Sequence, residues 1–417
     1  MLSINGNRLI EKINALGAIG KDEEGKRTRL AASDADKAGR DAVVEWMKDA
    51  DLKVVVDRIG NIFGIWETPM NKNEAPFMLG SHIDTVINAG QYDGCYGVLA
   101  GIEVIKALKE AGYVPKRPIA VGAFTNEEGV RYAPDMMGSL VYAGGLSVED
   151  ALTTIGTDGT ILGEELKRIG YEGTAEPGFL KPYAYVELHI EQGPILDVEG
   201  FQIGAVENLQ GISWQQITVE GAANHAGTTP IAQRIDAGLA AAKVIVFLRD
   251  RCDNSNATTV ATVGCIEFEP NAINVIPSKA VLTVDMRNPN EDKLKEEEKV
   301  FANYLKELEK TDKVGIAAER LVRFEPVKFD EAIVKLVEQA AEKRGFTSRR
   351  ITSGAGQDAQ MIARMCPTAM IFVPSINGIS HNPKEFTPDK DLIAGANVLL
   401  DVAIEMTGGQ MTGGRGY

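Results

Sequence analysis

The feature that most constrains the fold is a strand–helix–strand pattern between residues 77 and 125. Residues 77–81 and 119–125 are apolar runs of strand length, and residues 97–112 have the apolar spacing of a helix. Strands joined by a helix of this length lie parallel in one sheet, so their carboxyl ends meet at one edge. A further apolar strand at 183–189 is expected to end at the same edge. The pattern therefore predicts an α/β domain with a mainly parallel sheet and a ligand site at that edge.

Side chains of the kinds that bind divalent metals follow these predicted strands. His82 and Glu127 come just after two of them, His189 ends the third, and Asp93 precedes a glycine in the loop between. Glu127 and Glu128 are adjacent at a strand end and so point in different directions, which lets one bind a metal while the other acts as general base. An isolated acidic loop is usually solvated surface, but this one follows a buried strand. We therefore expect a hydrolytic metal site.

Asp84 lies two residues after His82. On an extended segment both side chains fall on the same side, so the carboxylate can accept a hydrogen bond from the ring. Such a partner fixes the imidazole tautomer and makes the ring a better metal ligand. We expect Asp84 to support His82 in this way.

The pattern changes near Gly211. Strands are predicted at 212–220, 258–267, 279–287 and 314–324, and helices at 231–249 and 291–311. The order βαββαβ is that of a ferredoxin-like unit. The prediction is a discontinuous catalytic domain of residues 1–210 and 326–407, an inserted domain of residues 211–325 and a disordered tail of residues 408–417.

Length, charge and cysteine content narrow the class of protein. A chain of 417 residues is too long for one ordinary hydrophobic core, so two domains are expected. Its net charge of -15 argues against nucleic acid or an anionic membrane as partner. The first 20 residues lack the apolar run of a signal peptide, and no window approaches the length of a membrane span, so a cytoplasmic location is expected. Four scattered cysteines without a CxxC spacing favour neither disulfides nor a thiolate zinc site.

Seven motifs in order resemble one known superfamily. They are GSHIDTV, YDGCYGV, NEEGVRY, ELHIEQGPILD, NHAGTTP, SGAGQDA and ISHNPKE. Together they resemble the hydantoinase/carbamoylase amidase branch of the dinuclear zinc aminoacylases and carboxypeptidases. That branch contains N-carbamoyl-L-amino acid hydrolases, β-ureidopropionases and allantoate amidohydrolases. The resemblance implies cleavage of the ureido C–N bond of an N-carbamoyl amino acid to the amino acid, ammonia and carbon dioxide, in a homodimer whose inserted domain serves for dimerisation and as a lid.

The resemblance also implies roles for individual residues. Two divalent ions per subunit are implied, zinc in the first place with manganese, cobalt or nickel as alternatives. The implied metal ligands are His82, Asp93, Glu128, His189 and His381, with Asp93 bridging. Glu127 is implied as general base and Asp84 as the support of a ligand. The implied substrate-binding residues are Gln192, Asn274, Arg287, Gly356 and His225, the last reaching into the neighbouring subunit's site to stabilise the oxyanion.

One departure and several alternatives stay open at this point. Gln357 stands where the family usually carries histidine in SGAGHDA, which puts in doubt the contact made by that ring. The substrate can be an N-carbamoyl α-amino acid, N-carbamoyl-β-alanine or allantoate. A metallopeptidase or aminoacylase with the same metals is the nearest rival, and a catalytically silent scaffold dimer is a rival of another class.

Overall fold

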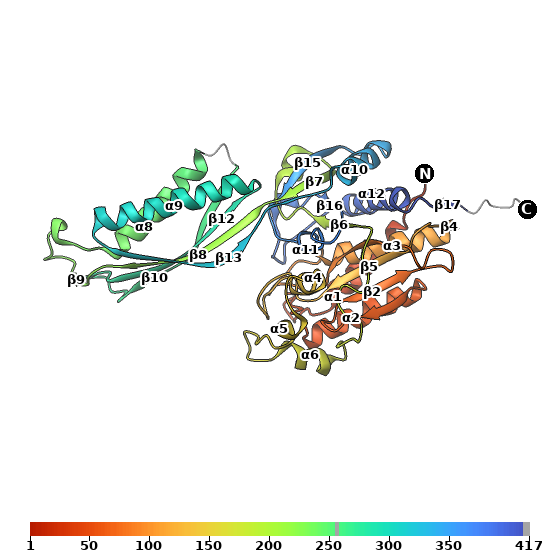
Figure 1. Cartoon of the computed structure of the whole chain (residues 1–417), viewed down its shortest axis with the longest axis horizontal. Coiled ribbons are helices and arrows are strands. Elements are labelled where there is room, and N and C mark those ends of the chain that lie inside the picture. The colour runs from red at the N-terminus through yellow and green to blue at the C-terminus, as the bar shows by residue number, and fades with distance from the viewer. Residues whose placement is uncertain (255–257, 412–417) are drawn as a thin grey trace, which may run out of the picture. The chain divides into compact units, whose positions relative to one another are not determined.

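The computed structural model describes residues 1–254 and 258–411, which divide into two compact units (Figure 1). Unit 1 comprises Met1–Glu207 and Phe329–Tyr417, and unit 2 comprises Asn208–Lys328. Unit 2 is thus inserted into the sequence of unit 1.

Unit 1 is built on a mixed sheet that also takes in the connecting segments. Its strands are β1 (Lys53–Val56), β2 (Ile62–Trp66), β3 (Phe77–His82), β5 (Ile119–Phe124), β6 (Ala184–Ile190), β7 (Ile203–Leu209), β14 (Val327–Lys328), β15 (Ser348–Ser353) and β16 (Thr368–Val373). The order is β1-β2-β5-β3-β6-β16-β7-β14, with β15 beside β7. The central strands β5, β3, β6 and β16 are parallel, as predicted for the fold class.

The pairs β1–β2, β2–β5 and β16–β7 are antiparallel. The sequence predicts the first of them, a hairpin of residues 53–57 with 61–66, but not the other two. A parallel pair needs a crossover of a dozen or more residues, whereas β1 and β2 are joined by five residues, 57–61. Strand β7 was not predicted.

Helices cover this sheet. The longer ones are α1 (Gly6–Ala18), α2 (Asp34–Asp49), α3 (Cys95–Glu110), α10 (Glu331–Lys343) and α12 (Asp389–Thr407). The shorter ones are α4 (Met137–Tyr142), α5 (Val148–Leu152), α6 (Leu162–Ile169), α7 (Ile195–Glu199), α11 (Asp358–Ile362) and the 3-10 turn η2 (Ile376–Gly378). Helix α3 is buried on nearly every side because it packs against β3, β5, β6, α1 and α12. Side chains cap several helices, as Asn5 does for α1 and Asp330 for α10.

Unit 2 has the predicted βαββαβ order. Its elements are β8 (Gly211–Glu220), α8 (Ala237–Asp253), β10 (Val260–Glu269), β12 (Lys279–Asn288), α9 (Glu291–Asp312) and β13 (Gly315–Phe324). The sheet order β10-β12-β8-β13 is antiparallel throughout and has α8 and α9 packed against one face (Figure 1). Two short strands, β9 (Asn224–His225) and β11 (Val275–Ile276), pair with each other.

The helix predicted at 231–249 begins later than expected. Residues Ile231–Gln233 form the 3-10 turn η1, and α8 begins at Ala237 because the side chain of Asp236 accepts a hydrogen bond from the amide of Leu239. His225 therefore lies on β9 and not at the start of a helix.

The predicted disordered tail is partly ordered. Strand β17 (Gln410–Met411) pairs with β4 (Tyr113–Val114), and the amide of Gly409 donates to the hydroxyl of Tyr113 at 2.7 Å. The prediction was wrong for residues 408–411, whose backbone finds partners in unit 1. Residues 412–417 lie outside the described residues.

Within residues 1–254 and 258–411, none of the helices has the length and apolar character needed to span a membrane.

Close packing of α3 on β6 gives a test of the fold. A Cβ on Gly97 would lie 2.5 Å from the carbonyl oxygen of Leu188. Gly97→Ala should lower the free energy of unfolding by about 1–3 kcal/mol, because the helix must move away from the strand. Urea unfolding followed by circular dichroism measures this. Gly264→Ala is the control, since no atom lies within 4 Å of a Cβ there. Equal stability of the two variants would contradict the packing argument.

Candidate metal centre and active site

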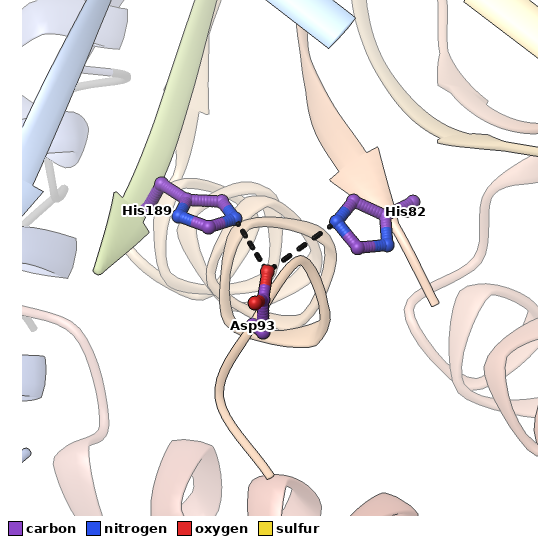
Figure 2. Close-up of side chains that lie close together, drawn as sticks. All are labelled: His82, Asp93 and His189. Carbon is purple, nitrogen blue, oxygen red and sulfur yellow. Dashed lines mark ion pairs between the residues drawn. The ribbon is translucent and has the colours of Figure 1, made fainter. Parts of the chain in front are cut away.

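The predicted ligands are brought together by parallel strands. In β3 and β5 His82 is the register partner of Phe124, and in β6 and β16 His189 is the partner of Phe372. Because these strands end at the same edge, His82, His189 and the loop after β5 lie close to one another. Figure 2 shows the rings of His82 and His189 both directed at the carboxylate of Asp93.

Asp93 is the centre of the cluster. Its Oδ1 lies 3.2 Å from Nε2 of His189 and 3.6 Å from Nε2 of His82. Its Oδ2 lies 3.3 Å from Nε2 of His381. The two carboxylate oxygens therefore face different imidazole rings, which is the arrangement of a bridging ligand.

Gly94 allows this close approach. Its φ is +64°, and a Cβ there would lie 2.4 Å from ring atoms of His82. Only glycine adopts this backbone conformation without strain and leaves room for the ring. The DG turn noted in the sequence thus positions a carboxylate against a histidine.

Backbone carbonyls orient two of the rings. Nδ1 of His82 lies 3.0 Å from the carbonyl oxygen of Asp84, and Nδ1 of His189 lies 2.8 Å from that of Ile190. A carbonyl only accepts, so each Nδ1 carries the hydrogen and each Nε2 is turned toward Asp93. Nε2 of His82 is buried without a hydrogen-bond partner among the described residues. A lone pair facing carboxylates in this way fits a bound cation, and the nitrogen and oxygen donors suit a divalent metal.

Glu127 and Glu128 point to different rings, as expected. Oε2 of Glu127 lies 3.4 Å from Nε2 of His82, and Oε2 of Glu128 lies 3.4 Å from Nε2 of His381. The carboxylate of Asp84 accepts the backbone N–H groups of both glutamates at 3.2 Å.

The expected contact between the Asp84 carboxylate and the His82 ring is not made as predicted. The carboxylate lies 3.9 Å from Nδ1, and the carbonyl oxygen of Asp84 takes the ring hydrogen instead. Strand β3 ends at His82, and Asp84 lies in the loop beyond it. The carboxylate is thereby free to hold the two amides of the glutamate loop.

Side chains in the cluster form overlapping groups that could hold metal ions. One group is His82, Asp93 and His189, and another is Asp93, Glu128 and His381; in each group the ligand atoms lie within 4.8 Å of one another. A third combines His82 with Glu127 and Glu128. The first two groups contain all five predicted ligands and share Asp93.

Burial and mutual charge shift the protonation of these groups. Burial lowers the pKa of His82, but Glu127 and the other nearby carboxylates raise it well above its usual value. Burial raises the pKa of Asp93, but the three neighbouring imidazole rings hold it well below its usual range. Burial raises the pKa of Glu128 to about 8, and the hydrogen bond to Asp93 raises that of His381 to about 9.

The predicted substrate residues of unit 1 lie near the cluster. Nε2 of Gln192 donates to Oδ2 of Asp93 at 2.8 Å, so this carboxamide already contacts a predicted metal ligand. Gly356 lies in the loop before α11, close to Met136. Helix α11 has only five residues and begins with the buried Asp358.

The predicted substrate residues of unit 2 do not lie together. His225 and Asn274 are both exposed at the β9–β11 pair, beyond the Lys279 end of β12. Arg287 lies eight residues further along β12, roughly 26 Å away by strand rise, and is ion-paired with Asp285 at 2.8 Å. Within one chain, Arg287 and the His225–Asn274 pair cannot contact the same small molecule.

Sequence reasoning missed Glu385 and Ser380. Oε1 of Glu385 accepts from the amides of Tyr92 at 2.9 Å and Asp93 at 3.4 Å, and its Oε2 accepts from the Ser380 hydroxyl at 3.0 Å. Glu385 thus ties the loop that carries Asp93 to the loop that carries His381. The sequence feature that could have indicated Glu385 is its position in the motif ISHNPKE, four residues after His381.

Comparisons with known proteins agree with this geometry. Residues 78–405 match peptidase family M20/M25/M40. The chain belongs to this family. It is 38% identical to an N-carbamoyl-L-amino-acid amidohydrolase of Rhizobium meliloti, over 96% of either chain. It is 34% identical to an allantoate amidohydrolase of Bacillus subtilis, over 96% of this chain and 97% of the relative.

A solved structure agrees as well. The crystal structure of a hydantoinase/carbamoylase family amidase from Burkholderia multivorans matches with a TM-score of 0.93 and 40% identity, covering 97% of this chain and 98% of the other. The predicted family and fold class are confirmed. Family membership and the buried cluster together indicate that the site binds divalent metal.

Metal binding should release protons. Glu128 and His381, with pKa values of about 8 and 9, bear protons at pH 7 in the metal-free protein. A cation must displace these protons, so its apparent affinity should rise with pH from about 7 to about 9. Calorimetric titration with zinc in two buffers of different ionisation enthalpy measures the release. Binding without proton release at pH 7 would contradict the protonation described here.

Proposed function

We propose that this protein is a metal-dependent amidohydrolase that cleaves the ureido C–N bond of an N-carbamoyl amino acid, giving the amino acid, ammonia and carbon dioxide. The observation that carries the proposal is the carboxylate of Asp93, whose two oxygens face two sets of ligands beside the buried Glu127. A relative named as an N-carbamoyl-L-amino-acid amidohydrolase supports it. A relative named as an allantoate amidohydrolase makes allantoate the second candidate substrate.

Two divalent cations per chain would be held by this cluster. One set of ligands is His82, His189 and Oδ1 of Asp93, and the other is Glu128, His381 and Oδ2 of Asp93. Zinc is proposed first, with manganese, cobalt or nickel as alternatives, because imidazole and carboxylate suit them all. Such a pair, when bound, polarises a carbonyl and lowers the pKa of water.

Glu127 is proposed as the general base. It belongs to neither of the two ligand sets that share Asp93, yet its carboxylate faces the cluster at His82. Glu127 would take a proton from the attacking water and deliver it to the leaving nitrogen. Burial raises the pKa of Glu127 well above its usual value in the metal-free protein, and the positive charge of bound cations would oppose this shift. Asp84 would position Glu127 by accepting its amide hydrogen.

Ammonia release tests the reaction. The purified protein is assayed with N-carbamoyl-L-amino acids, N-carbamoyl-β-alanine, allantoate and an N-acetyl amino acid, before and after chelation and return of zinc or manganese. Metal-dependent ammonia from a ureido acid is expected. Acetate from the acetyl compound without ammonia would make the protein an aminoacylase, and no turnover with any compound would favour a silent scaffold.

Glu127→Gln separates catalysis from metal binding. The substitution should lower kcat by about 10²–10⁴-fold, since it removes a general base. The metal content should stay that of the parent protein because Glu127 is outside the two proposed sets. Turnover is measured by ammonia release and metal by elemental analysis. Near-parental turnover would remove Glu127 from this role.

We further propose a homodimer in which His225 of the partner subunit enters the site. Arg287 pairs with Ile212, which is four residues after Asn208, the first residue of unit 2. His225 and Asn274 lie at the opposite end of the sheet. One small substrate can meet both ends only if two chains contribute. The edge strand β10 supports dimerisation through unit 2, since it exposes Val260, Ile266 and Phe268.

Mixing two inactive variants tests the shared site. His225→Ala and Glu127→Gln should each be nearly inactive. In a mixed dimer one site combines an intact Glu127 with an intact His225 of the partner subunit, so random exchange should restore about a quarter of the parental activity. The measurement is ammonia release after the two proteins are unfolded and refolded together, with each variant refolded alone as control. No recovery in the mixture would contradict the shared site.

A further inference from the structure

We propose that Gln357 is a positioning residue: it fixes the orientation of the Gln192 carboxamide and thereby holds Oδ2 of Asp93 in place for a cation. This inference rests on the metal centre proposed above but on no particular substrate. It concerns a motif position at which this chain departs from the pattern it resembles.

A chain of two hydrogen bonds carries the proposal. Nε2 of Gln357 donates to Oε1 of Gln192 at 2.7 Å, and Nε2 of Gln192 donates to Oδ2 of Asp93 at 2.8 Å. An ionised carboxylate only accepts, so Gln192 must turn its NH₂ group to Asp93 and its carbonyl to Gln357. Gln357 must then present its own NH₂ group. The negative charge of Asp93 therefore determines which way both carboxamides are oriented.

The backbone of Gln192 holds its side chain at this point. Its φ is +58°, in the left-handed region that non-glycine residues rarely adopt, and its amide donates to the hydroxyl of Ser375 at 3.0 Å. The carboxamide itself can still rotate. A half-turn would bring its oxygen against Oδ2 of Asp93, and the contact with Gln357 opposes that turn.

The burial of Gln357 shows how strongly this orientation is preferred. The residue is 1% exposed, and its Oε1 has no hydrogen-bond partner among the described residues. A buried carbonyl without a partner is costly. The carboxamide nevertheless keeps its NH₂ group on Gln192, because the reverse orientation would set two carbonyl oxygens against each other.

A double-mutant cycle on cation binding tests the inference. The variants are Gln357→Met, Gln192→Met and the two combined, and Gln357→His is the control that keeps an N–H donor. Zinc and manganese affinities are measured in the absence of substrate by competition with a chromophoric chelator, and the midpoint of thermal unfolding is recorded for each.

Gln357→Met should weaken one of the bound cations by about tenfold without lowering the unfolding midpoint, since it also removes the unpaired oxygen. Gln357→His should stay within about threefold of the parent, and the combined variant should bind no more weakly than Gln192→Met alone. Parental affinity in Gln357→Met or in Gln192→Met, or additive losses in the combined variant, would overturn the inference.

The readout keeps this inference apart from the proposed reaction. Cation affinity does not depend on which substrate is hydrolysed, so failure of the ammonia assay leaves the cycle interpretable. If Gln357→Met fails to fold, Gln192→Met still tests whether the contact with Asp93 supports a cation, and parental affinity in that variant would overturn the inference.

Discussion

A buried carboxylate surrounded by three imidazole rings is the interaction on which this structure depends. Asp93 is 5% exposed, and removing a carboxylate from water is costly unless opposite charge and hydrogen-bond donors surround it. The imidazole rings come from three directions: His82 and His189 at the ends of parallel strands, and His381 in a loop 288 residues after Asp93 (381 - 93). The sheet thus forms the core of unit 1 and also places two imidazole rings against a buried carboxylate.

Local devices keep the carboxylate in that position. Gly94 lets the chain turn beneath the ring of His82, and Gly97 lets α3 lie against the carbonyl of Leu188, one residue before His189. Glu385 holds the backbone of the Asp93 loop from the other side. These contacts place the two oxygens of Asp93 on separate ligand sets, which the proposed reaction requires.

The sequence was sufficient for the parts of the site that depend on local pattern. His82, Glu127 and His189 follow or end apolar strands, and parallel strands bring their ends together without further information. The inserted unit was predictable because its strands and helices have clear periodicity, although η1 displaced the start of α8.

Contacts between distant segments were not predictable. Glu385 meets Tyr92 across 293 positions, and Gln357 meets Gln192 across 165, and no local periodicity marks such pairs. The role of Asp84 was misjudged because it lies in the loop after β3, where its backbone carbonyl and not its carboxylate meets the ring. The antiparallel pairings β2–β5 and β16–β7 and the pairing of β17 likewise depend on tertiary partners.

Anomalous diffraction from crystals of the zinc-loaded protein tests the central claim most directly. The account predicts two zinc ions in each chain, one on each carboxylate oxygen of Asp93, with His82 and His189 on the first and Glu128 and His381 on the second. A single ion, or two ions that do not share Asp93, would contradict it.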